Sequence, residues 1–303
     1  FATSNVIYMG SMFRNCKSVK TLDVSKFNTS KANGFNELFY GCASVTELNV
    51  SNFDTSNASS GMRNMFCGCS SLTSIDVSNF NTSKVTTMSN MFQDCGSLTQ
   101  LDVTNFDTSK VDNMTQMFRG LRGLTELDVS KLNTSSLKYA SYMFVGDYKL
   151  TKLDVSNWNT SKLENALGMF QDCSSITEFD FSKWDTSNLT ISQGMFNACF
   201  ALTTLDLSSF NTSKVTDFRW MFNNCSRLKT IYVKEYDPET DTGWTTKSST
   251  ASYATTTMFD NSTKLVGGNG TTYDANKRTI EYATIDTAET PGYFTNINDK
   301  PTE

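Results

Sequence analysis

The 303-residue sequence contains no histidine and only 3 prolines. Without histidine, the chain lacks the commonest general base, the usual zinc ligand and the base of Ser-His or Cys-His nucleophilic catalysis. We therefore expect a protein that is not an enzyme and that binds neither a metal nor a cofactor.

Excess positive charge and long apolar runs are also missing. The 26 Lys and Arg residues are outnumbered by 31 Asp and Glu residues, which leaves a net charge of −5. Nucleic-acid binding needs clustered basic residues, so no nucleic-acid partner is expected. No apolar run approaches the roughly 20 residues of a membrane span, so no direct membrane insertion is expected. The opening FATSNVIYMG has no signal-peptide pattern, so secretion has to be inferred from other features.

What the chain has in abundance is a repeat. A phenylalanine, usually preceded by methionine, recurs every 26 residues, with one interval of 27. Its copies are Phe13, Phe39, Phe66, Phe92, Phe118, Phe144, Phe170, Phe196 and Phe222, and a tenth, Phe259, follows after 37 residues. A fixed period of this length is typical of proteins built from stacked supersecondary units.

Each repeat contains a strand pattern followed by a helical pattern. Residues 98–106 read LxxLxVxxF, which fits the LxxLxLxxF pattern of the strand-bearing part of a leucine-rich repeat, and alternate residues are expected to face in and out. An Asx-Thr-Ser triplet follows, and then Val111, Met114, Met117 and Phe118 form one apolar helical face. The pattern predicts an α/β fold, a right-handed leucine-rich-repeat solenoid with one short parallel strand and a short helical turn per repeat.

Two regions are expected. Residues 1–233 form the repeat array, which begins in mid-repeat because Phe1 to Ser4 align with Phe27 to Ser30; this indicates an N-terminal truncation. Residues 234–303 comprise a polar insertion (234–257), a degenerate last repeat and a C-terminal cap that covers the open core.

The string MFxxCxSLTxLDVSNFDTSKVTxM resembles the BspA-like leucine-rich repeat of bacterial surface proteins, in its 26-residue variant. The resemblance covers roughly residues 1–233, and the tail looks like the closing segment of that family. It implies an extracellular protein at the bacterial cell surface that adheres to mucus glycoproteins, extracellular matrix or other cells. This sequence departs from the pattern at several positions: Asn49 replaces the strand aspartate, and Leu121 and Asp147 replace cysteine.

Aspartates occupy the middle outward position of the strand in most repeats, on what would be the concave sheet. Carboxylates about 5 Å apart repel by roughly 0.8 kcal/mol in water, so something must offset the repulsion. In a structural interpretation, each accepts hydrogen bonds from the Ser or Thr two residues later. In a functional one, the column is an acidic ligand groove, with or without bridging cations, and its protonation toward pH 4 strengthens binding to anionic glycans. The candidate binding residues are Asp23, Asp76, Asp102, Asp128, Asp154, Asp180 and Asp206.

Three other columns have a structural and a functional interpretation. The cysteines three residues after the repeat phenylalanine are buried thiols or, less simply, redox or metal groups. The Asx-Thr-Ser triplets are caps, although five also read as glycosylation sequons. The aromatic residues after the strand pack in the core or form a sugar-stacking stripe. The cysteines are Cys16, Cys42, Cys69, Cys95, Cys173, Cys199 and Cys225; the aromatics are Phe27, Phe53, Phe80, Phe106, Trp158, Trp184 and Phe210.

These observations favour an adhesin module that binds host mucin or matrix glycoprotein. A structural spacer that displays another domain away from the cell wall is the alternative. A glycan-active enzyme ranks third, because every repeat offers nearly the same carboxylates and no single site stands out.

Overall fold

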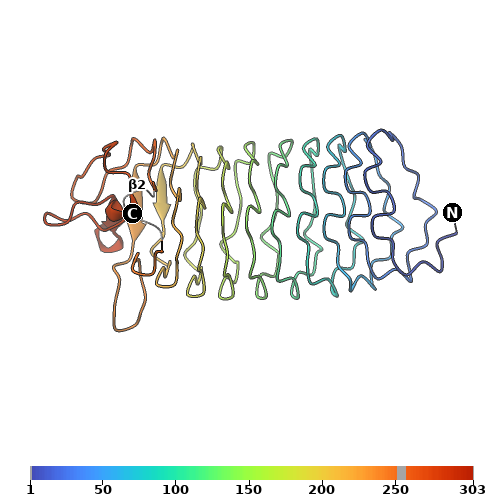
Figure 1. Cartoon of the computed structure of the whole chain (residues 1–303), viewed down its shortest axis with the longest axis horizontal. Coiled ribbons are helices and arrows are strands. Elements are labelled where there is room, and N and C mark those ends of the chain that lie inside the picture. The colour runs from blue at the N-terminus through green and yellow to red at the C-terminus, as the bar shows by residue number, and fades with distance from the viewer. Residues whose placement is uncertain (1, 251–256, 303) are drawn as a thin grey trace. The chain divides into compact units, whose positions relative to one another are not determined.

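The structure is a computed structural model that describes residues 2–250 and 257–302, in two compact units, Phe1–Leu153 and Asp154–Glu303. Within each unit the chain winds in coils, and consecutive coils lie side by side (Figure 1). In the first unit the Phe66 amide donates to the Met91 carbonyl at 3.0 Å, and in the second the Phe170 amide donates to the Met195 carbonyl at 3.0 Å. The sequence period is therefore the period of the stacked coils.

The sheet is parallel, as predicted, but its regular strands are few. In the described residues, β1 (Thr204–Asp206), β2 (Thr230–Val233) and β3 (Phe294–Asn296) pair in the order β1-β2-β3, all in the second unit. In the described part of the first unit, pairing at the strand position is reduced to single parallel bridges, Thr21 with Glu47 and Glu126 with Lys152. The expectation of one strand per repeat thus overstated the regular sheet.

The strands are short because the aspartate column ends them. The Thr104 amide donates to Asp102 Oδ1 at 2.9 Å instead of to a neighbouring coil. Two residues later the Phe106 amide donates to the Val103 carbonyl at 3.0 Å, which closes a turn. A coil with an aspartate at this position therefore leaves the sheet soon after it.

The predicted helical turn is wrong in its detail. The described residues contain two 3₁₀ helices, η1 (Ile280–Tyr282) and η2 (Ile297–Asp299), and no α-helix. Around Met117 the chain makes successive turns: the Met117 amide bonds to the Met114 carbonyl at 3.0 Å, but the next amide, that of Phe118, bonds to Met143 in the following coil at 3.1 Å. Amides that an α-helix would use internally hold adjacent coils together instead.

Two left-handed residues in each coil exclude a helix. One lies two residues before the repeat phenylalanine, as in Gln116 (φ 56°), and the other two residues after it, as in Gly120 (φ 74°). The second position is occupied mainly by Asn, Asp and Gly, the residues that adopt this conformation most readily.

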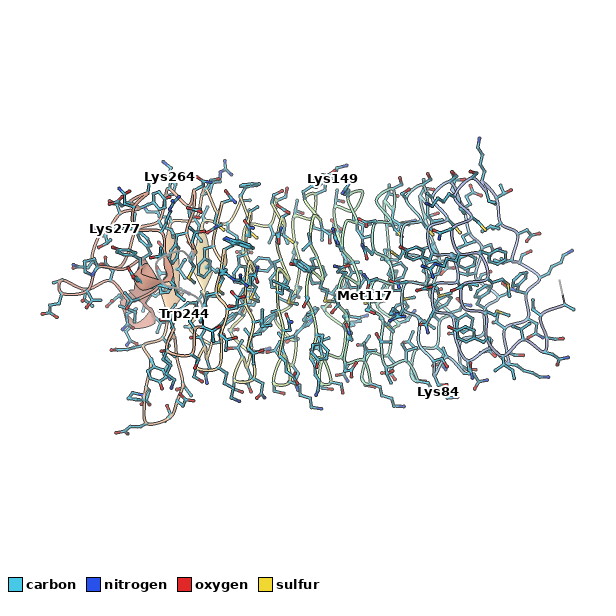
Figure 2. All side chains as sticks on the ribbon, viewed as in Figure 1. Lys84, Met117, Lys149, Trp244, Lys264 and Lys277 are labelled. Carbon is cyan, nitrogen blue, oxygen red and sulfur yellow. The ribbon has the colours of Figure 1, made fainter. Side chains whose placement is uncertain are left out.

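The interior is a set of aligned columns. In the first unit, Phe92 is fully buried and stacks between Phe66 (5.6 Å) and Phe118 (6.3 Å). In the second, Phe196 stacks between Phe170 (5.8 Å) and Phe222 (6.0 Å). Figure 2 shows side chains filling the interior, with Met117 inside and Lys84 and Lys149 at the outer edges. All seven aromatics of the proposed sugar stripe are also buried, which confirms the core interpretation.

The segment after Val233 continues the stack rather than interrupting it. Thr212 Oγ1 donates to the Thr245 carbonyl and accepts from the Thr245 amide, both at 2.7 Å. Trp244 is buried against Phe218 and Phe222. The hairpin around Asp237 and Thr242 is an addition to the 26-residue repeat. The rest of the expected insertion, residues 251–256, lies outside the described residues. Nowhere in the described chain is there a helix with the length and apolar character of a membrane span.

Candidate functional site

Every aspartate of the column accepts a hydrogen bond from its own coil. In each case Oδ1 accepts the backbone amide of the residue two positions later, at 2.9–3.1 Å. The serine or threonine hydroxyl at that position adds a second bond, as from Ser130 to Asp128 at 2.6 Å and from Thr104 to Asp102 at 2.7 Å. This is the arrangement of the structural interpretation. Asn49, which replaces the aspartate in one coil, makes the same two bonds to Ser51.

These bonds keep the carboxylates ionised. The side-chain and backbone hydrogen bonds from Ser130 hold the pKa of Asp128 below its usual value, and those from Ser182 do the same for Asp180. At Asp102 the backbone bond from Thr104 is the larger cause of the lowered pKa. Carboxylates with lowered pKa values keep more of their charge as the pH falls toward 4 than ordinary aspartates do. The expected strengthening of binding toward pH 4 stays a prediction, and the lowered pKa values act against it.

In the first unit, three members of the column line one groove. Asp76, Asp102 and Asp128 lie along a hollow of about 610 Å³, together with Glu126 and the threonines that precede the strand positions. No lysine or arginine is among its lining residues. We call this hollow the acidic groove.

The column in the second unit ends differently. Lys300, near the C-terminus, places Nζ 2.7 Å from Asp206 Oδ2 and 5.4 Å from the centre of the Tyr232 ring. Burial acts to raise the pKa of Asp206, but the bonds from Lys300 and Ser208 outweigh it and the pKa is lowered. Lys300 thus forms an ion pair with one carboxylate of the column.

The column does not assemble a metal centre. Among residues 2–250 and 257–302, no group of three or more His, Cys, Asp or Glu side chains is placed to hold a metal ion. A cation-bridged column is thus unsupported, and the groove remains a row of separate anionic positions.

The cysteines of the column are free thiols in the described structure, and all of them except the half-buried Cys16 are buried. Cys95 Sγ donates to the Phe66 carbonyl at 3.0 Å, and Cys199 Sγ donates to the Phe170 carbonyl at 3.2 Å. Burial raises the pKa of both thiols. Because the thiolate is the reactive form, these groups are inert, in agreement with the structural interpretation.

A column of threonines joins the coils. The sequence predicted only a capping role for the Asx-Thr-Ser triplets that contain them. Thr186 Oγ1 donates to the Asn211 carbonyl at 2.9 Å and accepts from the Asn211 amide at 2.8 Å. The triplet's first residue makes the local turn: Asn28 Oδ1 accepts from the Ser30 amide at 3.1 Å. The sequence carries a signal of this role, because the central Thr is the same in all the Asx-Thr-Ser triplets while the residue before it varies between Asn and Asp. The buried members are Thr3, Thr29, Thr55, Thr82, Thr108, Thr134, Thr160, Thr186 and Thr212, and among them Thr134 Oγ1 has no hydrogen-bond partner in the described structure.

A family model described as "Mycoplasma protein of unknown function, DUF285" matches the chain in overlapping segments, at residues 1–71, 44–152, 95–204, 122–236 and 146–267. The chain belongs to this family. The BspA-like relationship predicted from the repeat motif is thereby confirmed, and the DUF285 matches extend beyond residue 233 through the coil that carries Trp244.

Solved structures similar to this DUF285 chain are remote. A leucine-rich repeat protein of T. pallidum is 21% identical over 39% of this chain and 50% of its own, with a TM-score of 0.28. A leucine-rich cell surface protein of Faecalibacterium prausnitzii is 15% identical over 74% of this chain and 69% of its own, with a TM-score of 0.35. The functional domain of InlJ from Listeria monocytogenes, described as including a cysteine ladder, is 16% identical over 67% and 52%, with a TM-score of 0.19.

The chain spans about half the length of the treponemal and listerial proteins. A comparison with curated proteins finds no match. The coils and the acidic groove described above therefore rest on this chain's own geometry.

Proposed function

We propose that this chain is a non-catalytic recognition module at the bacterial cell surface, an adhesin that binds host mucus or extracellular-matrix glycoprotein. The observation that carries the proposal is the acidic groove of the first unit. Its carboxylates are held in fixed orientations, stay ionised and repeat from coil to coil. In this proposal the coils belong to a right-handed leucine-rich-repeat solenoid.

A row of fixed charges suits a partner with several matching groups. Asp102 and Asp128 each use Oδ1 for their own coil. Carboxylates held in place can bind ammonium or guanidinium groups with little loss of side-chain freedom. Repeated weak contacts along one polymer add up by effective concentration. Charge therefore favours the basic polypeptide segments of a glycoprotein over its sialylated glycans.

The experiment compares two pairs of Asp→Asn changes with equal effect on net charge. The test variant is Asp102→Asn with Asp128→Asn, in the groove. The control is Asp54→Asn with Asp107→Asn, in the Asx-Thr-Ser triplets, where other coils carry asparagine. Both variants should fold, because Asn49 keeps the turn bonds at the groove position. Binding is measured by surface plasmon resonance to immobilised fibronectin, laminin and mucin.

We expect the groove variant to bind about fivefold to tenfold more weakly, since each exposed ion pair contributes about 0.2–1 kcal/mol. The control should keep wild-type affinity for the same surface. Equal losses in the two variants would show that only net charge matters and would remove the groove from the proposal.

A spacer role is the second candidate. It is favoured by the self-contained hydrogen bonding of the aspartate column, which gives every carboxylate a structural task. Absence of saturable binding by the wild-type chain to all three surfaces would favour the spacer.

A further inference from the structure

A second hollow lies in the non-repeating part of the second unit. It measures about 640 Å³ and is formed by the segment 235–246, by η1 and the residues that follow it, and by Asn296 of β3. This volume falls in the range of small-ligand sites. We call it the cap cavity. It occurs once, unlike any feature of the 26-residue repeat.

The floor of the cap cavity is apolar and fixed. Trp244, Ile280 and Ala283 line it and are buried. Trp244 Nε1 donates to the Ala283 carbonyl at 3.0 Å, and its ring meets Phe294 edge-on at 4.9 Å. With its ring only 6% exposed, Trp244 offers no free face on which a sugar could stack.

Two carboxylates stand at the rim. Glu235 and Glu281 line the cavity and are exposed, and within the described residues neither carboxylate has a hydrogen-bond or ion-pair partner. No lysine or arginine lines the cavity. An anionic ligand would therefore be repelled, and a cation would find two unpaired acceptors.

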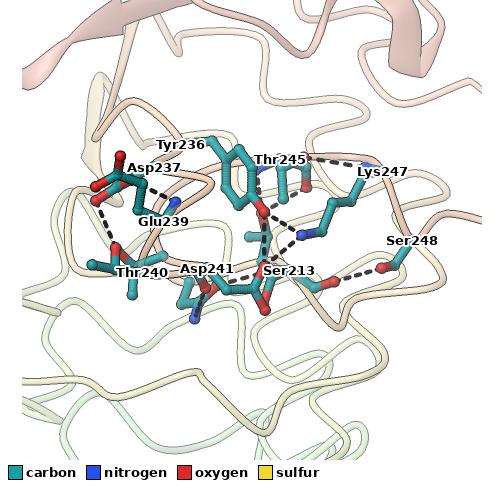
Figure 3. A network of polar contacts seen from close by, with 12 residues as sticks. Ser213, Tyr236, Asp237, Glu239, Thr240, Asp241, Thr245, Lys247 and Ser248 are labelled. Atoms are coloured by element: carbon teal, nitrogen blue, oxygen red, sulfur yellow. Dashed lines mark hydrogen bonds and ion pairs between the residues drawn. The ribbon is translucent and has the colours of Figure 1, made fainter.

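Lys247, which lies near the cavity in the chain, contacts other residues. Figure 3 shows Lys247 with its Nζ directed at Asp241 Oδ1 (2.5 Å) and at the hydroxyl of Tyr236. The same Nζ lies 4.5 Å from the centre of the Tyr236 ring, and Tyr236 donates to Asp241 at 2.8 Å. This network fixes the Tyr236 wall of the cavity and covers one face of its ring, while it keeps the lysine away from the glutamates.

From this combination we propose that the cap cavity binds an alkylammonium group, with the apolar stem against the half-buried side chains of Tyr236 and Ile285 and the charged head at Glu235 and Glu281. Long amines bury their methylene groups against apolar surface while the ammonium group stays at a polar rim. The threonine hydroxyls around the cavity supply additional acceptors. This site is separate from the acidic groove, and its test does not depend on adhesion.

The test uses the whole chain and the indole N–H signal of Trp244 in ¹H–¹⁵N spectra. Nα-acetyl-lysine N-methylamide and its uncharged counterpart, Nα-acetyl-norleucine N-methylamide, are titrated in parallel, and cadaverine is titrated separately. We expect the lysine derivative to shift the Trp244 signal saturably and the norleucine derivative to leave it in place. Preference for the lysine derivative over cadaverine identifies a polypeptide side chain as the source of the amine; the reverse identifies a free amine.

The variant Glu235→Gln with Glu281→Gln should raise the dissociation constant about tenfold or more, because both charge-assisted contacts are lost. Its matched control is Glu178→Gln with Glu239→Gln, which changes two exposed glutamates outside the cavity and should bind as wild type. The single Glu235→Gln and Glu281→Gln variants guard against a folding defect in the double variant. An equal response to the norleucine derivative, unchanged affinity in the Glu235/Glu281 variant, or no response to any amine would overturn the proposal.

Discussion

The inward and outward columns of the coils repeat with the same period but make opposite kinds of contact. Inward residues bond to the neighbouring coil: Thr186 bonds both backbone groups of Asn211, and Cys95 bonds the carbonyl of Phe66. Outward aspartates bond within their own coil, as Asp102 does with Thr104. The inward columns therefore stabilise the stack, and the outward column shapes the surface without contributing to the stack.

This difference separates stability from recognition. The stability of stacked repeats depends on the interfaces between adjacent repeats, so an inward change weakens two interfaces at once. An outward change alters one local turn. Substitutions in the two columns should consequently differ in size by several fold, and the following predictions test this from the largest effect to the smallest.

The largest effect is expected from Phe92→Ala. Phe92 is fully buried and stacks on a phenylalanine from each adjacent coil, so its removal leaves a cavity between three coils. We expect the free energy of unfolding to fall by about 3–5 kcal/mol, measured by urea denaturation. Phe200→Ala is the matched control, because Phe200 is 46% exposed. Similar losses in both variants would contradict the importance of the inward column.

Thr186→Val should cost about 2–4 kcal/mol in the same measurement. Valine keeps the shape, but the amide and the carbonyl of Asn211 lose their shared partner in a largely buried position. The neighbouring half-exposed Ser187 provides the control substitution Ser187→Ala. If Thr186→Val matches that control, the threonine column is not a coil-to-coil link.

The sequence predicted these columns better than it predicted their backbone. The Met-Phe spacing predicted the stacking of Phe66, Phe92 and Phe118, and the Asp-Val-Ser pattern led to the turn bonds at Asp128. The helical turn was wrong because apolar residues three apart, such as Met114 and Met117, fit successive three-residue turns as well as a helix. Only a left-handed residue between them distinguishes the two, and Gln116 at that place gives no compositional signal.

The cap cavity could not be predicted from the sequence at all. Its lining residues come from two segments, 235–246 and 280–296, which are far apart in the chain and carry no repeat to align them. The acidic groove, in contrast, needed only the 26-residue period, because equal positions in adjacent coils become neighbours in space.

Asp147 also tests the difference between inward and outward columns, because it places a carboxyl group in the inward cysteine column. It is fully buried, Oδ1 accepts from the Leu121 amide at 2.7 Å, and Oδ2 has no partner among the described residues. Burial raises the pKa of this carboxyl well above its usual value. In the unfolded chain the same group ionises near pH 3.9, so its contribution to stability is fully present below that pH and is lost as the pH rises toward the folded-state pKa.

We expect wild-type protein to lose about 1–3 kcal/mol between pH 4.5 and pH 7, from urea midpoints, and Asp147→Cys to lose much less. The substitution restores the thiol found in other coils, which can donate to the Phe118 carbonyl as Cys95 does to Phe66. The chain has no histidine, and the aspartates with lowered pKa values are already ionised at pH 4.5, so the comparison is little disturbed. The same pH dependence in both proteins would exclude Asp147 as its source.

The smallest effect belongs to the outward column. Asp102→Asn should change the free energy of unfolding by no more than about 0.5 kcal/mol, because asparagine preserves both turn bonds, as Asn49 shows. The lowered pKa of Asp102 leads to a second expectation: a partner bound through the groove should lose less affinity between pH 7 and pH 4 than it would with carboxylates of ordinary pKa. Surface plasmon resonance at both pH values checks this, with the Asp102→Asn and Asp128→Asn variant as the uncharged reference. A wild-type affinity that approaches that of the variant already at pH 4 would mean that the groove carboxylates titrate normally, and the hydrogen bonds from Thr104 and Ser130 would not be what keeps this face charged.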